Sequence, residues 1–234
     1  MSVFGFSIEP STSSGGDFTP IIKYDARAGR IFRIDRLDTG NGFENNPVDI
    51  TATFKAVVDF EHVETGWMDF ATGTAPSFVL VPMGQEMPTR PSTKHKPGIR
   101  FCLKLSKTCG GDKPVREIAS NAKSYLNGVA KVYEEYRREA AKYPGQLPVL
   151  SLASTTPVTS GSGTQKSTNY VPTFRIEGWK PRPEDLKHVP APLPVSGNGQ
   201  ITQGAPSTGH QTVPPPNKLS VVPQANNNLD DDFG

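Results

Sequence analysis

Several short stretches of the chain alternate between apolar and polar residues, the pattern of strands with one face buried and the other in water. Residues 99–105 are the clearest case, with Ile99, Phe101, Leu103 and Leu105 on one face and Arg100, Cys102 and Lys104 on the other. Similar alternation or short apolar runs predict further strands over residues 31–37, 50–61, 78–81, 148–153 and 173–179. The stretch TTPVTSGSGTQKSTN, which separates the last two, is rich in Ser, Thr and Gly and predicts a flexible loop.

A change of period predicts one long helix over residues 114–142. Its apolar side chains recur every three or four positions, at Ile118, Ala122, Tyr125, Val129, Val132, Tyr136 and Ala140. Pro114 suits the first turn of a helix, and Asp112 suits the cap before it. Pro144-Gly145 suits the end of the helix.

Together these elements predict a mainly β fold with one long helix. The helix follows the third main strand and precedes the fourth, which is its usual place in an OB-fold, a five-stranded Greek-key barrel. We therefore expect an OB-like domain over residues 18–187, with another small antiparallel α+β domain as the alternative.

The two ends of the chain lack this periodic pattern. Residues 1–17 are rich in Ser and Gly and predict a flexible N-terminal arm. Residues 188–234 consist largely of Pro, Gly, Ser, Gln and Asn, and such a segment cannot bury enough apolar surface to offset the entropy of ordering it. We expect this segment to be a disordered tail.

Composition and charge also distinguish the predicted folded body from the predicted tail. Hydrophobic residues are 35% of the 234, below the roughly 45–50% of globular chains. The formal net charge is +2, but it is unevenly spread. From His188 onward the charged residues are Lys218, Asp230, Asp231 and Asp232, so a mildly basic body precedes an acidic end.

Several classes of protein are not expected. The N-terminus MSVFGFSIEP does not resemble a secretory signal, and no apolar run is long enough to span a membrane. Cys102 and Cys109 have no further Cys or His at zinc spacing, so we expect neither a disulfide framework nor a metal site, and no cofactor. The predicted location is the cytoplasm.

A basic tract is the first candidate for function. No acidic residue occurs between Glu86 and Asp112, and this stretch holds Arg90, Lys94, Lys96, Arg100, Lys104 and Lys107. Arg100 and Lys104 share the polar face of one predicted strand, and a Pro-rich loop leads into it. A strand face and loop of one charge sign would follow a phosphate backbone without sequence preference. An ordinary solvated face is the alternative.

Aromatic residues are the second candidate, because unpaired bases stack on exposed rings. Trp67 follows a glycine in a predicted turn, Tyr170 lies in a polar stretch, and Trp179 is one step away from the apolar face of its strand. These three are the predicted stacking rings. Core packing is the alternative for each of them.

The third candidate is the tip of the tail, residues 229–234, which holds Asp230, Asp231, Asp232 and Phe233. Three carboxylates beside one ring form a compact docking peptide for a basic-rimmed apolar pocket. The same tip could also fold back onto the basic tract when no nucleic acid is bound.

Enzyme chemistry is weakly supported. One segment gathers Asp59, Glu61, His62, Glu64 and Asp69. Asp59 and Glu61 are expected on one strand face and His62 on the other, so these side chains are not expected to converge. Motifs of nucleotide-binding and hydrolytic enzymes are absent from the sequence.

Residues 45–187 resemble bacteriophage single-stranded DNA-binding proteins of the OB-fold type. The resemblance lies in the segments VVDFEHVETGWMDF, HKPGIRFCLKLS, GGDKPVREIASNAK and FRIEGWKPRPEDL. The tip also resembles the acidic tails of bacterial and phage proteins of this kind, which recruit replication and repair enzymes. Those tails end on the aromatic residue, whereas Gly234 follows Phe233 here, which puts docking to the usual partners in doubt.

The expected function is therefore to coat and protect single-stranded DNA in phage replication or recombination, with partners recruited through the tip. Self-association into a homo-oligomer is left open. One alternative is a phage structural or scaffolding protein that binds no nucleic acid. A less favoured one is a metal-dependent nuclease that uses the acidic segment near His62.

Overall fold

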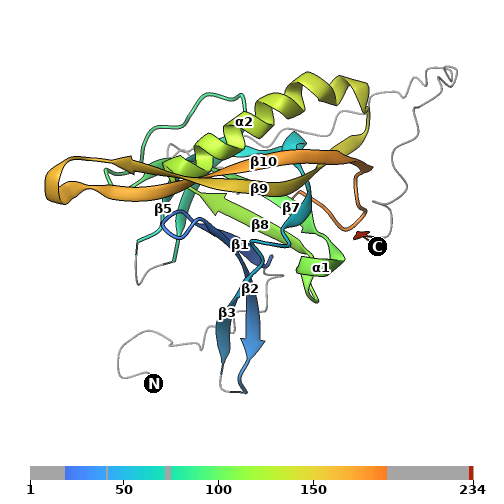
Figure 1. Cartoon of the computed structure of the whole chain (residues 1–234), viewed down its shortest axis with the longest axis horizontal. Helices are drawn as coiled ribbons and strands as arrows, with labels where there is room; N and C mark the ends of the chain where they lie inside the picture. The colour runs from blue at the N-terminus through green and yellow to red at the C-terminus, as the bar shows by residue number, and fades with distance from the viewer. Residues whose placement is uncertain (1–18, 41, 72–74, 189–231, 234) are drawn as a thin grey trace, which may run out of the picture.

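The chain folds as one mixed β-sheet with a long helix packed against it (Figure 1). This structure is a computed structural model that describes residues 19–40, 42–71, 75–188 and 232–233. Its strands are β1 (Ile21–Asp25), β2 (Arg30–Asp38), β3 (Phe43–Asp49), β4 (Lys55–Val58), β5 (Glu64–Asp69), β6 (Ser77–Pro82), β7 (Lys96–Leu105), β8 (Val115–Ser120), β9 (Gln146–Ser160) and β10 (Ser167–Pro181). The helices are α1 (Lys107–Gly110) and α2 (Lys123–Glu139), with 3-10 turns η1 (Phe60–His62), η2 (Ala140–Lys142) and η3 (Gly163–Gln165).

Within the described residues the sheet has 10 strands in the order β10-β9-β4-β7-β8-β1-β2-β3, with β5 and β6 branching from β7. The mainly β fold with one long helix is thus confirmed, but the five-stranded barrel is wrong. The sheet is open, with β10 and β3 at the two ends of the strand order, and β1 pairs with β8 in parallel through Ile21 and Ile22. Strands β1 and β3, which the sequence pattern did not reveal, flank the predicted strand within β2 and extend the sheet beyond β8.

The predicted helix over residues 114–142 is also wrong at its start. Residues 115–120 form β8, and Ile118 pairs with Phe101 of β7 in the core. The helix begins only at Lys123, with Ala122 rather than Asp112 at its cap position. The spacing between Ile118 and Ala122 fits a helix, but the strand register places Ile118 equally well on the buried face.

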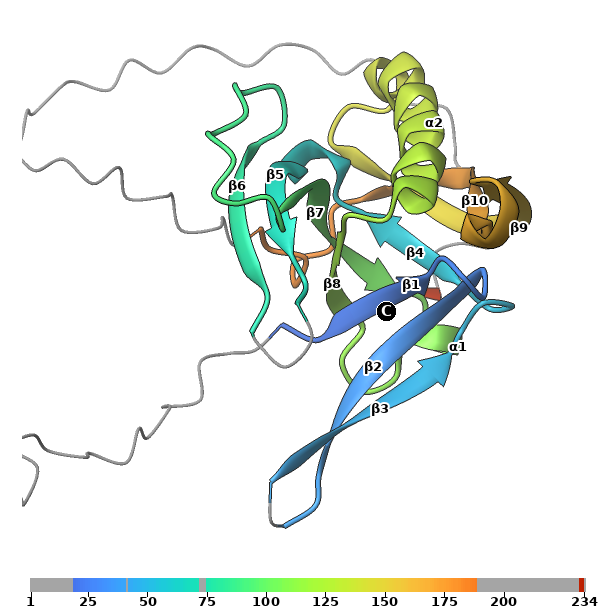
Figure 2. The ribbon, with the colours of Figure 1, turned by 90° about the vertical axis from the view of Figure 1, so that its left-hand side faces the viewer.

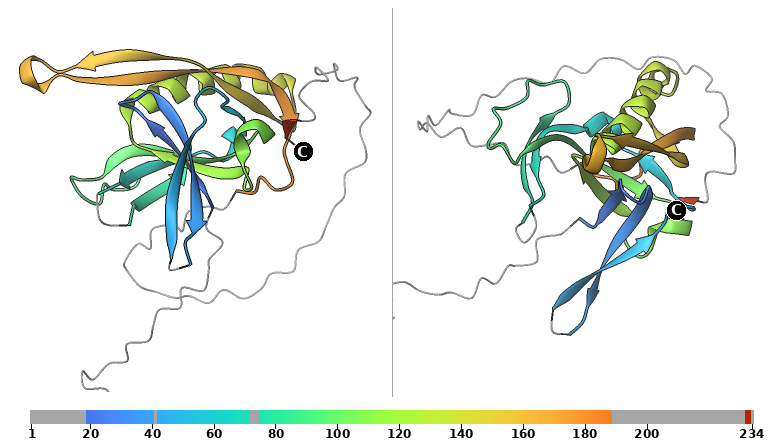
Figure 3. Two further views of the ribbon diagram at one scale, coloured as in Figure 1. Left: turned by 60° about the horizontal axis from the view of Figure 1, so that its bottom comes forward. Right: turned by 60° about the vertical axis from the view of Figure 1, so that its left-hand side comes forward.

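The predicted flexible loop over residues 155–169 belongs to a long two-stranded ribbon instead. Strands β9 and β10 pair along it up to Ser160 and Ser167, and their Thr159 and Thr168 hydroxyls lie 2.8 Å apart. Figure 3 shows this ribbon projecting beyond the end of α2. Its Thr and Val residues favour extended backbone, which outweighs the Ser and Gly content that suggested a loop.

The predicted strand 50–61 is interrupted. Residues 51–53 form a turn, β4 covers four residues, and η1 follows it. Ile50, Phe54 and Phe60 are nevertheless buried, as their alternation indicated. The remaining predicted strands lie within β2, β6, β7, β9 and β10.

The main core lies between α2 and one face of the sheet (Figure 2). From the helix it receives Tyr125, Val129, Val132 and Tyr136, which pack with Phe101, Leu103 and Leu105 of β7. A second, smaller cluster covers the other face of the sheet, which we call the outer face. No helix in the described part of the chain is long and apolar enough to cross a membrane.

Candidate nucleic-acid interface

The outer face carries the predicted polar side of β7. Phe101, Leu103 and Leu105 are buried under α2, so Arg100, Cys102 and Lys104 point the other way. Cys102 packs there with Val57 of β4 and Val149 of β9. The alternation in the sequence therefore gave the correct facing for this strand.

Arg100 is engaged by carboxylates of the protein itself. Its Nε lies 2.9 Å from Glu64 of β5 and 3.2 Å from Glu117 of β8. Burial raises the pKa of Glu117, and the charge of Arg100 opposes that rise. A guanidinium held between two carboxylates has little charge left to offer a phosphate, so Arg100 mainly stabilises the junction of these strands.

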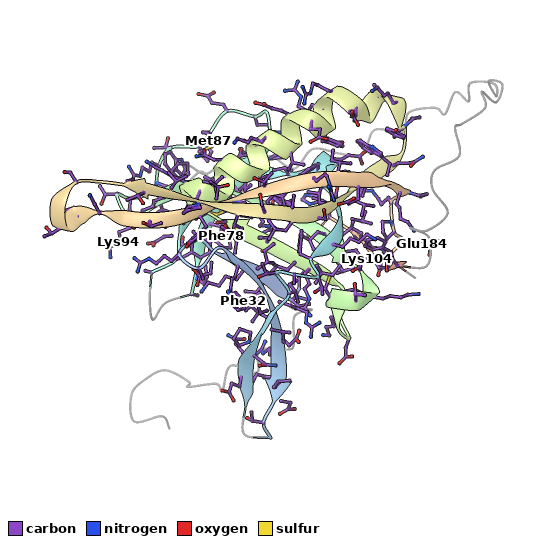
Figure 4. The ribbon with its side chains drawn as sticks, viewed as in Figure 1. Phe32, Phe78, Met87, Lys94, Lys104 and Glu184 are labelled. Atoms are coloured by element: carbon purple, nitrogen blue, oxygen red, sulfur yellow. The ribbon has the colours of Figure 1, made fainter. Side chains whose placement is uncertain are left out.

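Lys104 is covered by residues 182–188, which we call the strap. Lys104 Nζ lies 3.1 Å from Asp185, and Leu186 of the strap is buried in the outer cluster. Figure 4 shows Lys104 beside Glu184, at the opposite end of the molecule from Lys94. The predicted basic tract is thus divided between two places on the molecule.

Arg182 anchors the start of the strap to a buried carboxylate. Its Nη1 and Nη2 donate to the two oxygens of Asp59 at 2.6 and 2.8 Å, and Asp59 is fully buried. Burial alone would raise the pKa of Asp59, but hydrogen bonds from Arg182 and His62 hold that pKa below its ordinary value. At the other end of the strap, His188 stacks on His62 with ring centroids 4.9 Å apart.

The acidic segment does converge, contrary to the sequence-based expectation. Ligand atoms of Asp59, Glu61 and His62 lie within 4.8 Å of one another. They come together because residues 60–62 form a 3-10 turn rather than a strand. Arg182 fills the space between them, since its Nη2 also lies 2.7 Å from Glu61. The arrangement is therefore an ion-pair network that fastens the strap.

All four other predicted phosphate-binding residues are exposed, but one of them is engaged by its own loop. Arg90 donates to the carbonyl oxygens of His95 and Thr93 and covers the Trp67 ring at 5.3 Å, so it shapes its own loop. The other three are Lys94 in the loop before β7, Lys96 at the start of β7 and Lys107 in α1. They remain the best-placed cations of the predicted set.

The predicted stacking rings are largely engaged in packing. Trp67 is half-buried and donates through Nε1 to the carbonyl oxygen of Pro88 at 2.6 Å. Tyr170 is half-buried, and its carbonyl accepts from the Tyr24 hydroxyl. Trp179 is 6% exposed and stacks on Tyr143 at 4.7 Å. Trp179 therefore belongs to the core in this structure.

Other rings reach solvent that the sequence analysis did not select. Phe70 is 42% exposed and Phe43 62% exposed. Phe70 directly follows β5, and Phe43 begins β3, so both flank segments that join antiparallel strands. An aromatic residue beside a hairpin turn is a sequence signal that could have identified them.

The tip of the tail lies on the outer face. Lys55 Nζ is 2.5 Å from Asp232 Oδ2, and Lys180 Nζ lies over the Phe233 ring at 5.4 Å. Phe233 is 5% exposed and completes the outer cluster of Val57, Cys102, Leu147, Val149 and Leu186. Asp230 and Asp231, like the predicted N-terminal arm and the tail up to Asp231, lie outside the described residues.

The geometry defines what this part of the outer face can hold. Two lysines meet a carboxylate and a ring that is otherwise surrounded by apolar side chains. A nucleotide presents the same pair of groups, an anion and a flat ring. Searches against protein-family models, curated proteins and solved structures found no match for this chain. The resemblance to phage proteins therefore stays a prediction.

Proposed function

We propose that this protein binds single-stranded DNA on the outer face of its sheet, with little sequence preference. The observation that carries the proposal is the place taken by Asp232 and Phe233, a bound anion and ring between Lys55 and Lys180. Lys94, Lys96 and Lys107 add exposed positive charge along and beyond β7. A duplex hides its bases from such an apolar contact, so a single strand is the better ligand.

In this proposal the tip and the DNA compete. A strand that reached Lys55 and Lys180 would displace Asp232 and Phe233, because the same cations and apolar surface would serve both ligands. The displaced acidic tip would then be available to a replication or recombination protein with a basic-rimmed pocket. Binding of DNA and exposure of the docking peptide would thus be linked.

The test is fluorescence anisotropy with labelled oligo(dT) and a duplex of equal length, over a series of salt concentrations. We expect preference for the single strand, and a slope of log K against log salt of about −3 to −4 if four to six phosphates are engaged. Deleting residues 229–234 should tighten binding. A full-length and a tip-deleted protein that both fail to bind at low salt would refute the proposal and favour a phage structural protein.

A further inference from the structure

The hairpin of β5 and β6 carries an exposed aromatic pair that the basic tract does not include. Phe70 and Phe78 lie at the end of this hairpin, with ring centroids 5.5 Å apart and planes at 67°. Phe70 is 42% exposed and Phe78 partly so. An edge-to-face pair of this kind leaves ring surface open to a third flat group.

The strand register places this pair on the outer face. Met68 of β5 is paired with Phe78 of β6 on one side and with Lys96 of β7 on the other. Side chains directly opposite one another share a face, so Phe78, Met68 and Lys96 form a row across three strands. Lys96 and Arg100 are four residues apart on β7, which puts them on the same face. Adjacent strands lie about 4.8 Å apart, so the row spans about 10 Å.

The other face of the hairpin is held in place by the loop that follows it. Trp67, one step from Met68, donates to the Pro88 carbonyl and is covered by Arg90. His95 is buried and lies within hydrogen-bond distance of Ser92 and, at 3.2 Å, Ser77 of β6. These contacts position the aromatic pair without covering it, since they lie on the opposite face or beyond the strand end.

The charge around the pair indicates what it binds. Lys96 is on the same face, and Lys94 is in the adjoining loop, both exposed. By contrast, Phe43, which is also strongly exposed, is directly opposite Asp38 in the β2–β3 register, and Arg36 lies over its ring at 4.2 Å. Residues 21–49 carry five basic and five acidic side chains, so that hairpin offers no excess of positive charge.

We infer that Phe70 and Phe78 form a stacking site for an unpaired nucleobase, with Lys96 and Lys94 meeting the phosphates beside it. This inference rests on the proposed function and extends it to a hairpin outside the expected five-stranded core. The strand would run from the site of the tip, at Lys55 and Lys180, toward Lys96, and the rings would hold the bases at its far end.

The test compares Phe70→Ala, the milder Phe78→Leu, and Phe43→Ala as a matched control for an exposed ring on another hairpin. The tip is deleted in all proteins, and each binds oligo(dT) and an abasic oligonucleotide of equal length. We expect Phe70→Ala to weaken oligo(dT) binding about 10-fold, with an unchanged salt slope. Phe78→Leu should weaken it less, and Phe43→Ala should have little effect. The abasic strand should bind all variants alike.

The possible outcomes distinguish failure of the proposed DNA binding from failure of the stacking site. If the unsubstituted protein binds neither oligonucleotide, the proposed function fails, and this site fails with it. If the unsubstituted protein binds oligo(dT) and the Phe70→Ala protein binds it as tightly, the stacking site is refuted while DNA binding stands. The same holds if Phe70→Ala weakens binding to the abasic oligonucleotide as much as binding to oligo(dT). Unchanged thermal unfolding of the variants would confirm that they are folded.

Discussion

At the residue scale, the structure separates cations that stabilise the fold from cations that can serve a ligand. Arg100 and Arg182 have similar chemistry to Lys94 and Lys96, but their partners are buried carboxylates. Charge reversal at Arg100 would bring three acids together, the new one with Glu64 and Glu117, and disturb the sheet. Lys94 and Lys96 are therefore the better positions at which to test phosphate contacts.

Substituting Lys94 and Lys96 by alanine should weaken oligo(dT) binding and reduce the magnitude of its salt slope by about 0.7 per lost phosphate contact. The reason is that each lysine releases condensed counterions when it neutralises a phosphate. Titrations at four or more salt concentrations would measure the slope. Lys131→Ala, an exposed lysine on α2, is the control and should leave the slope unchanged. Equal slopes for all proteins would exclude a role for the two lysines.

Asp59 makes stability depend on pH. Its pKa is lower in the folded protein than in the unfolded chain, so its contribution is present above the unfolded pKa and is lost as pH falls through the folded pKa. The free energy of unfolding should therefore begin to fall below pH of about 4. Asp59→Asn should lower the free energy of unfolding by about 3–5 kcal/mol at pH 7 and make it depend less on pH.

Urea denaturation at pH 7 and at acid pH would measure both effects. Asp185→Asn breaks the more exposed pair with Lys104 and is the control, with an expected change below about 1 kcal/mol. An Asp59→Asn protein as stable as the unsubstituted one would mean that Arg182 does not need this partner.

At the element scale, the close approach of α2 to β10 depends on one glycine. A Cβ added to Gly128 would clash with the Pro172 carbonyl and lie 2.7 Å from Pro172 Cγ. Neither group is the end of a flexible side chain, so the helix itself would have to move. The main core, which receives Val129 and Val132 from this helix, would move with it.

Gly128→Ala should therefore destabilise the protein by about 1–3 kcal/mol, even though alanine favours a free helix by about 1 kcal/mol. Asn127→Ala, at the exposed neighbouring position, should be neutral or slightly stabilising. Chemical denaturation would measure the free energy of unfolding of the two variants. A Gly128→Ala protein that is more stable than the unsubstituted one would show that α2 and β10 have room between them.

At the scale of the whole molecule, the tip links the end of the chain to the middle of the sheet. Phe233 and Leu186 cover Cys102 from outside, while α2 and its partners cover the other side of β7. Burial raises the pKa of the Cys102 thiol to about 11. The reactivity of this thiol is thus a direct measure of whether the tip is in place.

Deleting residues 229–234, or the single change Phe233→Ala, should increase the rate at which a thiol reagent labels Cys102. Saturating oligo(dT) should do the same if DNA displaces the tip. Labelling kinetics followed by mass spectrometry would distinguish Cys102 from Cys109, which is buried on the core side and should not respond. Equal Cys102 rates with and without the tip would contradict its placement on the outer face.

The sequence by itself determined the buried faces of β7 and of α2. The alternation of residues 99–105 correctly predicted the two faces of β7, and the spacing of Tyr125, Val129 and Val132 correctly predicted the buried stripe of α2. These are local properties, because the period of apolar residues follows from the geometry of one element. The aromatic and acidic character of the tip could be seen in the same way.

Only the tertiary structure decided which elements pair and which side chains remain available. Ile118 fits a helix or a strand until β7 offers it a partner, and Arg100 and Lys104 look free until Glu64, Glu117 and Asp185 reach them from distant parts of the chain. Phe70 and Phe78 join the outer face only through the register with Met68 and Lys96. Strand pairing and ion pairing join residues far apart in the chain, so local periodicity carries no record of them.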